Sequence, residues 1–151
     1  MHNSLIPNLM VHDVCDTALF YQNVLGFKLI VAVADFEAEM EEGNIIMSLG
    51  QGQKLDWANL KLDPEDSTSA EFMFQSRRSL EADLPAFKGV AISASQTLYL
   101  RNKDVDAQYE SLKNKVDVVQ EPITRFYGMR EWYMKDNNGY VLCFGQELGQ
   151  G

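Results

Sequence analysis

The same succession of a short strand, an aspartate and an amphipathic helix occurs twice along this chain. In the first copy, Asp13 precedes apolar residues at helical spacing, and Gly26 follows where a left-handed residue would end the helix. In the second copy, Asp104 follows the strand "TLYLR" and precedes a helical stripe that includes Tyr109 and Leu112. A pattern that repeats in the same order predicts two modules built on one plan.

Each copy also closes with two alternating strands joined by a polar turn. The stretch "WANLKLDPEDSTSAEFMFQ" ends the first copy, and "REWYMKDNNGYVLCFGQ" ends the second. With the strand that follows each helix, both copies have the order βαβββ. One helix per module would cover one sheet face and leave the other free. The sequence therefore predicts an α+β fold in which two tandem βαβββ modules form a concave, partly open mixed sheet around a cleft.

The two predicted modules divide a single domain, 1–151, unequally. The first module spans 1–75 and carries an insertion at about 36–55. A linker follows at 76–95, and the second module spans 96–147. A domain of this length buries about 70% of the surface that its unfolded chain exposes, so it can build a core without disulfides.

Charge and composition narrow the classes of function. The net charge of −9 repels phosphate backbones, so no nucleic-acid partner is expected. The two cysteines and two histidines lack the spacing of a zinc site built from nitrogen and sulfur ligands. No apolar run is long enough to span a membrane, and the N-terminus lacks a signal-peptide pattern. We therefore expect a cytoplasmic protein with no membrane partner.

Several short motifs are shared with a known family. That family has a strand, an Asp, a helix with Phe-Tyr and Leu-Gly-Phe, and later a Gly-x-Arg-Glu-Phe strand followed by an Asp-Pro-x-Gly turn. The matching places here hold Asp13, Phe20-Tyr21, Leu25-Gly26-Phe27, Gly128-Met129-Arg130-Glu131-Trp132 and Asp136-Asn137-Asn138-Gly139. On these motifs the chain resembles the vicinal oxygen chelate superfamily, which includes glyoxalase I, extradiol dioxygenases, fosfomycin-resistance enzymes and bleomycin-resistance proteins. The resemblance implies the glyoxalase/bleomycin-resistance fold.

The resemblance also implies where a metal would be held. In metal-dependent relatives, the first and last strands of each module supply four side chains to one divalent ion. By strand position these would be Ile6, Glu71, Thr97 and Cys143, of which only Glu71 is a normal ligand for a hard cation. The sequence is therefore similar to the metal-free branch, the bleomycin-resistance proteins. No metal, no other cofactor and no catalytic residue are expected.

Strand alternation predicts which side chains face the cavity. If the apolar residues of each strand pack on the helices, the other residues face the cavity, with Trp57 at its mouth. The predicted ligand-binding residues are Asn8, Trp57, Glu71, Met73, Tyr99, Arg101, Glu131, Tyr133 and Cys143. Carboxylates select positive charge, and tyrosines supply stacking and cation–π contacts. We expect a homodimer that sequesters a small cationic or aromatic ligand, such as an antibiotic of the bleomycin type, as the resemblance implies.

Each of these assignments has a purely structural alternative. Glu71 and Glu131 would then belong to ion pairs, with Arg101 or Arg130 as their partners. The tyrosines would pack across strands, and Trp57 would cover an edge. The cysteine of the last strand would be a small buried hydrophobic residue and not a nucleophile.

Two other functions remain open at the level of sequence. The first is a divalent-metal-dependent lyase, isomerase, dioxygenase or thiol transferase of the same superfamily. It requires Gln75 or His12 to join the two glutamates as ligands. The second is a fold that serves assembly alone and binds no ligand.

Overall fold

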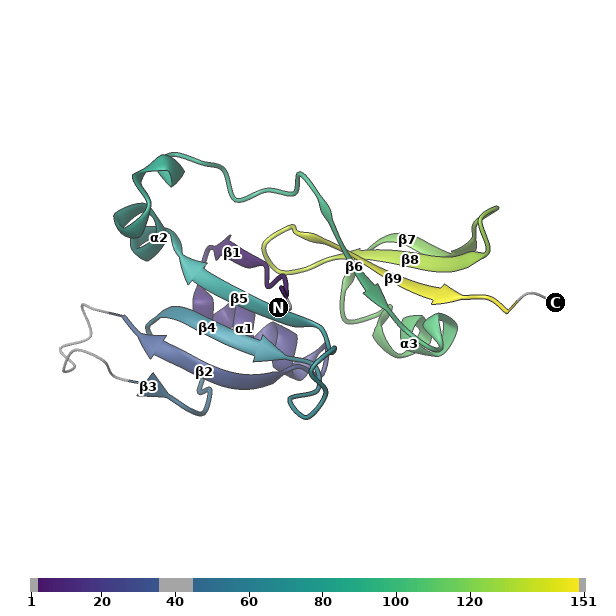
Figure 1. The fold of residues 1–151 in the computed structure, drawn as a ribbon, viewed down its shortest axis with the longest axis horizontal. Helices are drawn as coiled ribbons and strands as arrows, with labels where there is room; N and C mark the ends of the chain where they lie inside the picture. Colours follow the sequence, from purple (N-terminus) through teal and green to yellow (C-terminus); the bar gives the residue numbers. More distant parts are fainter. Residues whose placement is uncertain (1–2, 36–44, 150–151) are drawn as a thin grey trace. The chain divides into compact units, whose positions relative to one another are not determined.

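The computed structural model describes residues 3–35 and 45–149, in two compact units, Met1–Ile92 and Ser93–Gly151 (Figure 1). The elements of the first unit are β1 (Asn8–Val11), α1 (Val14–Asn23), β2 (Lys28–Ala34), β3 (Ile45–Ile46), β4 (Leu55–Lys61), β5 (Glu71–Ser76), α2 (Arg77–Asp83) and the 3-10 helix η1 (Pro85–Phe87). Those of the second are β6 (Thr97–Arg101), α3 (Val105–Leu112), β7 (Asp117–Thr124), β8 (Met129–Lys135) and β9 (Val141–Glu147).

The first unit is a five-stranded sheet in the order β1-β5-β4-β2-β3 with α1 against one face (Figure 1). β1 runs parallel to β5, and the other neighbouring strands are antiparallel. Tyr21 of α1 is fully buried, and its ring centroid lies 5.5 Å from that of Phe72 and 4.7 Å from that of Phe74. Both phenylalanines are buried, as expected if the apolar residues of this strand pack on the helix.

The second unit repeats this plan in a four-stranded sheet, in the order β6-β9-β8-β7, with β6 parallel to β9. Trp132 and Met134 of β8 are fully buried. The indole of Trp132 contacts α3, because its Nε1 donates to Gln108 Oε1 at 3.0 Å and its ring lies 5.4 Å from that of Tyr109. The prediction of an α+β fold with two tandem modules is confirmed.

The aspartates that mark the duplication cap both helices. The Asp13 side chain accepts a hydrogen bond from the backbone N–H of Asp16 at 2.8 Å, and Asp104 accepts one from Ala107 at 3.0 Å. Gly26 has a φ of 80°, a backbone conformation that residues with a side chain rarely adopt. Local capping chemistry therefore sets where each helix begins and where the first one stops.

The predicted insertion and linker are described only in part. Residues 36–44 of the insertion lie outside the described residues, while Ile45–Ile46 forms β3 and Leu55 begins β4. The predicted linker contains α2 and η1. The predicted cleft would be formed by both modules together, and it stays a prediction. Among the described residues, no helix combines the length and apolar character needed to cross a membrane.

Candidate functional site

The open face of the second sheet buries a carboxylate. Because Trp132 and Met134 point toward α3, their neighbours Glu131 and Tyr133 point to the opposite face of β8. Glu131 is nevertheless only 1% exposed. Lys, Glu, Arg and Asp are almost never fully buried without a partner, so the surroundings of this side chain define the candidate site.

Three tyrosines and a cysteine surround the Glu131 carboxylate. Its Oε1 accepts hydrogen bonds from the hydroxyls of Tyr127 at 2.6 Å and Tyr99 at 3.4 Å. Its Oε2 accepts from the Tyr133 hydroxyl at 2.7 Å and from the Cys143 thiol at 3.7 Å. We call Glu131 and these four residues the tyrosine–carboxylate cluster. Four donors around one carboxylate replace the water that burial removes.

Strand register brings the members of the cluster together. Cys143 of β9 lies between Tyr99 of β6 and Tyr133 of β8, since it is the register partner of both. Glu131 lies opposite Gly145 in the same way. Residues opposite one another in a ladder project to the same face. Three neighbouring strands therefore place four cluster members on one surface.

Two glycines complete the arrangement. A Cβ on Gly145 would lie 2.1 Å from the Tyr99 hydroxyl, so the ring of Tyr99 occupies the space above this glycine. In the β7–β8 turn, Gly128 has a φ of 83°, and its N–H donates to the Arg125 carbonyl at 3.1 Å. This turn brings Tyr127 back toward Glu131.

The cluster holds an anion and keeps its neighbours protonated. Desolvation opposes ionisation of Glu131, but hydrogen bonds from Tyr127, Tyr133 and Cys143 outweigh it and lower the pKa of this carboxyl. Burial and the charge of Glu131 raise the pKa of Tyr99 to about 12. The hydrogen bond to Glu131, with burial, also raises the pKa values of Tyr127 and Tyr133.

Burial raises the pKa of Cys143 to about 12, and the charge of Glu131 acts in the same direction. The thiolate, not the thiol, is the nucleophile and the metal ligand. The Cys143 side chain is fully buried. The arrangement therefore favours an inert thiol that donates to a carboxylate. This agrees with the alternative in which the cysteine is a small buried residue and not a nucleophile.

The ion-pair alternative is wrong for Glu131, because both candidate arginines lie near other carboxylates. Arg130 forms a bidentate ion pair with Asp106, in which its Nε and Nη2 donate to the two carboxylate oxygens at 2.7 and 2.8 Å. Arg101 is exposed and lies 4.0 Å from Glu147. The guanidinium of Arg125 lies over the Tyr133 ring, 5.9 Å from its centroid.

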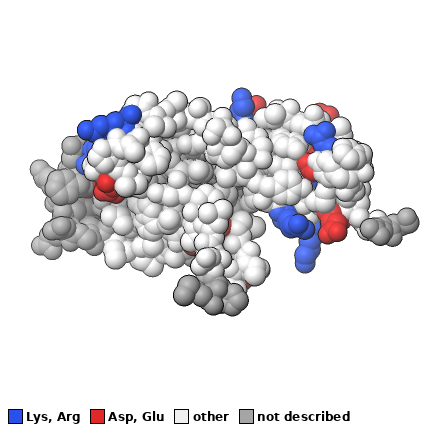
Figure 2. All heavy atoms as spheres, turned by 45° about the horizontal axis from the view of Figure 1, so that its top comes forward, with Lys and Arg blue, Asp and Glu red and all other residues white. Residues whose placement is uncertain are grey.

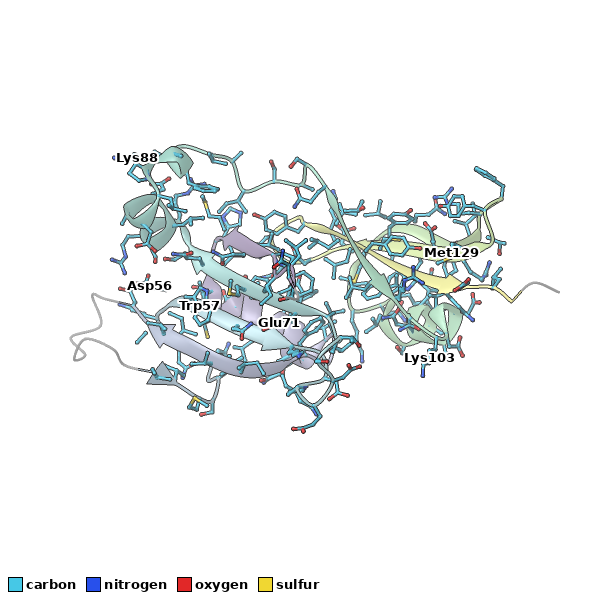
Figure 3. All side chains as sticks on the ribbon, in the orientation of Figure 1. Asp56, Trp57, Glu71, Lys88, Lys103 and Met129 are labelled. Atoms are coloured by element: carbon cyan, nitrogen blue, oxygen red, sulfur yellow. The ribbon has the colours of Figure 1, made fainter. Side chains whose placement is uncertain are left out.

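The remaining predicted residues lie in the first unit, on the sheet face opposite Phe72 and Phe74. They are Asn8 of β1, Trp57 of β4, and Glu71 and Met73 of β5, and Figure 3 labels Trp57 and Glu71. Glu71 accepts a hydrogen bond from the Asn59 amide at 3.1 Å. Asn8 donates to Gln75 at 2.9 Å. That these residues bind a ligand stays a prediction.

The four positions implied for a metal do not fit a divalent ion. Thr97 lies opposite Val141, while Cys143 lies opposite Tyr99, so the predicted pair does not meet across β6 and β9. Ile6 lies ahead of β1 and has no donor atom in its side chain. Among the described residues, no group of three His, Cys, Asp or Glu side chains comes together to hold a metal.

Sequence reasoning missed Tyr127 and Gly145. Tyr127 lies between two strands, where alternation makes no prediction about side-chain direction. The available signal was the "FYG" stretch, because its glycine predicts a turn and its tyrosine lies four residues before Glu131. Gly145 matters only through the Tyr99 ring above it, a contact between different strands.

On the face shown in Figure 2, the described acidic and basic side chains lie in small mixed groups and not in one acidic patch. Recognition of a cation would depend on local groups such as Glu131.

Comparison with solved structures supports the fold. A glyoxalase-related enzyme from Clostridium phytofermentans is 16% identical, with a TM-score of 0.67 over 98% of this chain and 97% of that one. A glyoxalase/bleomycin resistance protein/dioxygenase family enzyme from Burkholderia phytofirmans PsJN is 16% identical, with a TM-score of 0.65 over 93% and 95%. TioX from Micromonospora sp. ML1 is 15% identical, with a TM-score of 0.61 over 99% of both chains.

No curated protein matches the chain in sequence. The family model for the Glyoxalase/Bleomycin resistance protein/Dioxygenase superfamily matches residues 5–144. This match covers most of both units and includes the whole tyrosine–carboxylate cluster. With two tandem modules and this match, the chain belongs to the Glyoxalase/Bleomycin resistance protein/Dioxygenase superfamily, also called the vicinal oxygen chelate superfamily.

Proposed function

We propose that this protein binds a small cationic or aromatic organic molecule at the tyrosine–carboxylate cluster and performs no metal-dependent chemistry on it. The observation that carries the proposal is the Glu131 carboxyl group, 1% exposed and held by phenol hydroxyls. Two of these phenols are themselves accessible, since Tyr99 is 47% exposed and Tyr127 is 53% exposed. A charge just beneath accessible aromatic rings suits an organic cation.

Aromatic surface around the cluster supports this ligand class. Phe126, next to Tyr127, is fully exposed at the tip of the β7–β8 hairpin, and the two rings meet edge to face with centroids 5.1 Å apart. A cation over a tyrosine or phenylalanine face gains about 0.5–1 kcal/mol at an exposed site and about 2 kcal/mol when desolvated. Planar groups of a ligand could stack on the same rings. Basic glycopeptides of the bleomycin type combine positive charge with planar groups.

The chemistry of the cluster supports binding over metal-dependent catalysis. Both Glu131 oxygens already accept hydrogen bonds from phenols. The Cys143 thiol, with a pKa of about 12, is a poor metal ligand in its protonated form. A metal would have to displace phenol hydroxyls and deprotonate a buried thiol.

A thermal-shift panel tests the binding proposal. We expect metal-free bleomycin and benzylamine to raise the melting temperature, because a ligand that binds only the folded chain stabilises it by mass action. Benzoate, an aromatic anion, serves as the matched control and is expected to leave the melting temperature unchanged. If no cationic or aromatic compound in the panel changes the melting temperature, the proposal fails.

Elemental analysis of the purified protein tests the absence of a metal role. We expect less than stoichiometric Mn, Fe, Ni and Zn, and no change in melting temperature when EDTA is added. One equivalent of bound metal together with destabilisation by EDTA would instead favour a metal-dependent enzyme of this superfamily.

We further propose that the chain acts in the cytoplasm as a homodimer. Each sheet has two edge strands, and βαβββ modules can pair between chains as well as within one. Sedimentation equilibrium should give twice the chain mass of 17.1 kDa. A mass of one chain at micromolar concentration would contradict the dimer.

A further inference from the structure

The four hydrogen bonds to Glu131 are not equivalent. Strong O–H···O bonds are about 2.5–3.0 Å long. The hydroxyls of Tyr127 and Tyr133 meet this range at 2.6 and 2.7 Å, whereas the Tyr99 hydroxyl lies 3.4 Å from Oε1. Tyr99 therefore makes the weakest phenol contact, and it shares its acceptor oxygen with Tyr127.

Tyr99 is also less enclosed than Tyr133 by its position in the sheet. It lies on β6, an edge strand, whereas Tyr133 lies on β8, which is paired on both sides. The Tyr133 ring is further covered by the Arg125 guanidinium. The Tyr99 ring extends over Gly145, where no side chain fixes it from below. Movement of Tyr99 would break one long hydrogen bond and no strand pairing.

We propose that the Tyr99 hydroxyl holds the place of the ligand's charged nitrogen: a protonated amine with at least one N–H displaces it and donates to Glu131 Oε1. The contacts of Tyr127, Tyr133 and Cys143 with the carboxylate remain in place. This inference rests on the proposed function and specifies its ligand class. The site takes primary and secondary ammonium groups and discriminates against quaternary ammonium groups.

The requirement for an N–H follows from the burial of Glu131. When a donor leaves a buried, ionised carboxylate, the lost hydrogen bond must be replaced or the anion is left under-solvated. An ammonium N–H replaces the long phenol contact of 3.4 Å with a bond in which donor and acceptor are both charged, and such bonds are about 2.7–2.9 Å long. A quaternary ammonium brings charge without a donor. Its methyl groups also hold the charge farther from Oε1.

Two probes with the same ring and charge test this inference on the intact chain. Benzylamine and benzyltrimethylammonium are titrated into the protein at pH 7 by calorimetry. We expect benzylamine to bind about tenfold more tightly, the ratio that corresponds to one hydrogen bond to a charged group. Because both probes are used on the unmodified protein, this comparison does not depend on the folding of a variant.

The Tyr99→Phe variant provides a second test, because displacement of the hydroxyl and a purely structural role of the hydroxyl predict opposite changes in the affinity for benzylamine. The variant keeps the ring above Gly145 but removes the hydroxyl that competes for Oε1, so benzylamine should bind several-fold more tightly than to the wild type. Tyr109→Phe is the matched control, because its hydroxyl contacts Glu121 at 3.2 Å, outside the cluster. That control should leave the affinity for benzylamine unchanged.

The possible results separate the inference from the function on which it rests. Equal affinities for the two probes, or weaker benzylamine binding by Tyr99→Phe, would overturn the displacement of Tyr99 while the binding function stands. Failure of both probes and of the whole thermal-shift panel would overturn the proposed function and this inference together. Preference for benzylamine together with tighter binding by Tyr99→Phe would establish the displacement.

Discussion

Gly145 lies opposite Glu131 in the β8–β9 ladder, and the space that a side chain at this glycine would fill is taken by the Tyr99 ring. A missing side chain on one strand thus allows a phenol from the next strand to reach a buried carboxylate on the third. The cluster depends on this close approach as much as on the hydrogen-bonding groups themselves.

Gly145→Ala should displace Tyr99. The new Cβ would lie 2.1 Å from the Tyr99 hydroxyl and 2.5 Å from its ring carbon, so the side chain must move away from Glu131. Because Tyr99 is exposed on an edge strand, it can move at a cost of about 1 kcal/mol, comparable to one net hydrogen bond. Urea denaturation measures this cost. Gly149→Ala, which meets no atom within 4 Å, is the control, and equal stability of the two variants would contradict the account.

Glu131→Gln should destabilise the fold by about 1–3 kcal/mol. The amide keeps the shape of the carboxylate but replaces one acceptor oxygen with an NH2 group that faces phenol donors. Chemical denaturation gives the free energy of unfolding. Glu147→Gln changes the same chemical group at an exposed position and should lie within about 0.5 kcal/mol of the wild type. Similar unfolding free energies for the two variants would show that Glu131 contributes no more to stability than an exposed glutamate.

The contribution of Glu131 to stability should disappear in acid. Its pKa in the folded protein lies below the ordinary value of 4.5, so folding favours the ionised form. This contribution is complete above about pH 4.5 and declines as the pH falls through the lowered pKa of the folded state. The difference in unfolding free energy between wild type and Glu131→Gln should therefore shrink as the pH is lowered from 7 to 3. A constant difference across this range would contradict the lowered pKa.

Both cysteines should resist alkylation in the native protein. Burial raises the pKa of Cys15 and raises that of Cys143 to about 12, and both thiols are inaccessible. Iodoacetamide at pH 8 should label neither residue until denaturant is added, after which both should react, as followed by mass spectrometry. Rapid labelling of Cys143 in the native state would support a nucleophilic role.

Much of the fold follows from local patterns in the sequence. Asp13 and Asp104 cap their helices as expected, and alternation in β8 places Trp132 in the core and Glu131 on the other face. These features depend on neighbours a few residues apart, which the sequence displays directly.

The site was predicted less completely because its contacts join separate strands. Glu131 and Tyr133 were expected to face a cavity, but alternation does not reveal that phenols from β6 and the β7–β8 turn bury the carboxylate. The contact between Asn59 and Glu71 likewise depends on the register of β4 and β5. Such distances are set by strand pairing, which a linear pattern does not specify.

The most direct test of the central claim compares cation binding by wild type, Glu131→Gln and Glu147→Gln in the same calorimeter, with benzylamine as the probe at pH 7. The account predicts that wild type and Glu147→Gln bind with the same affinity and that Glu131→Gln loses at least about tenfold, because the buried charge is gone. Equal binding by all three proteins would contradict the assignment of Glu131 as the group that recognises the ligand.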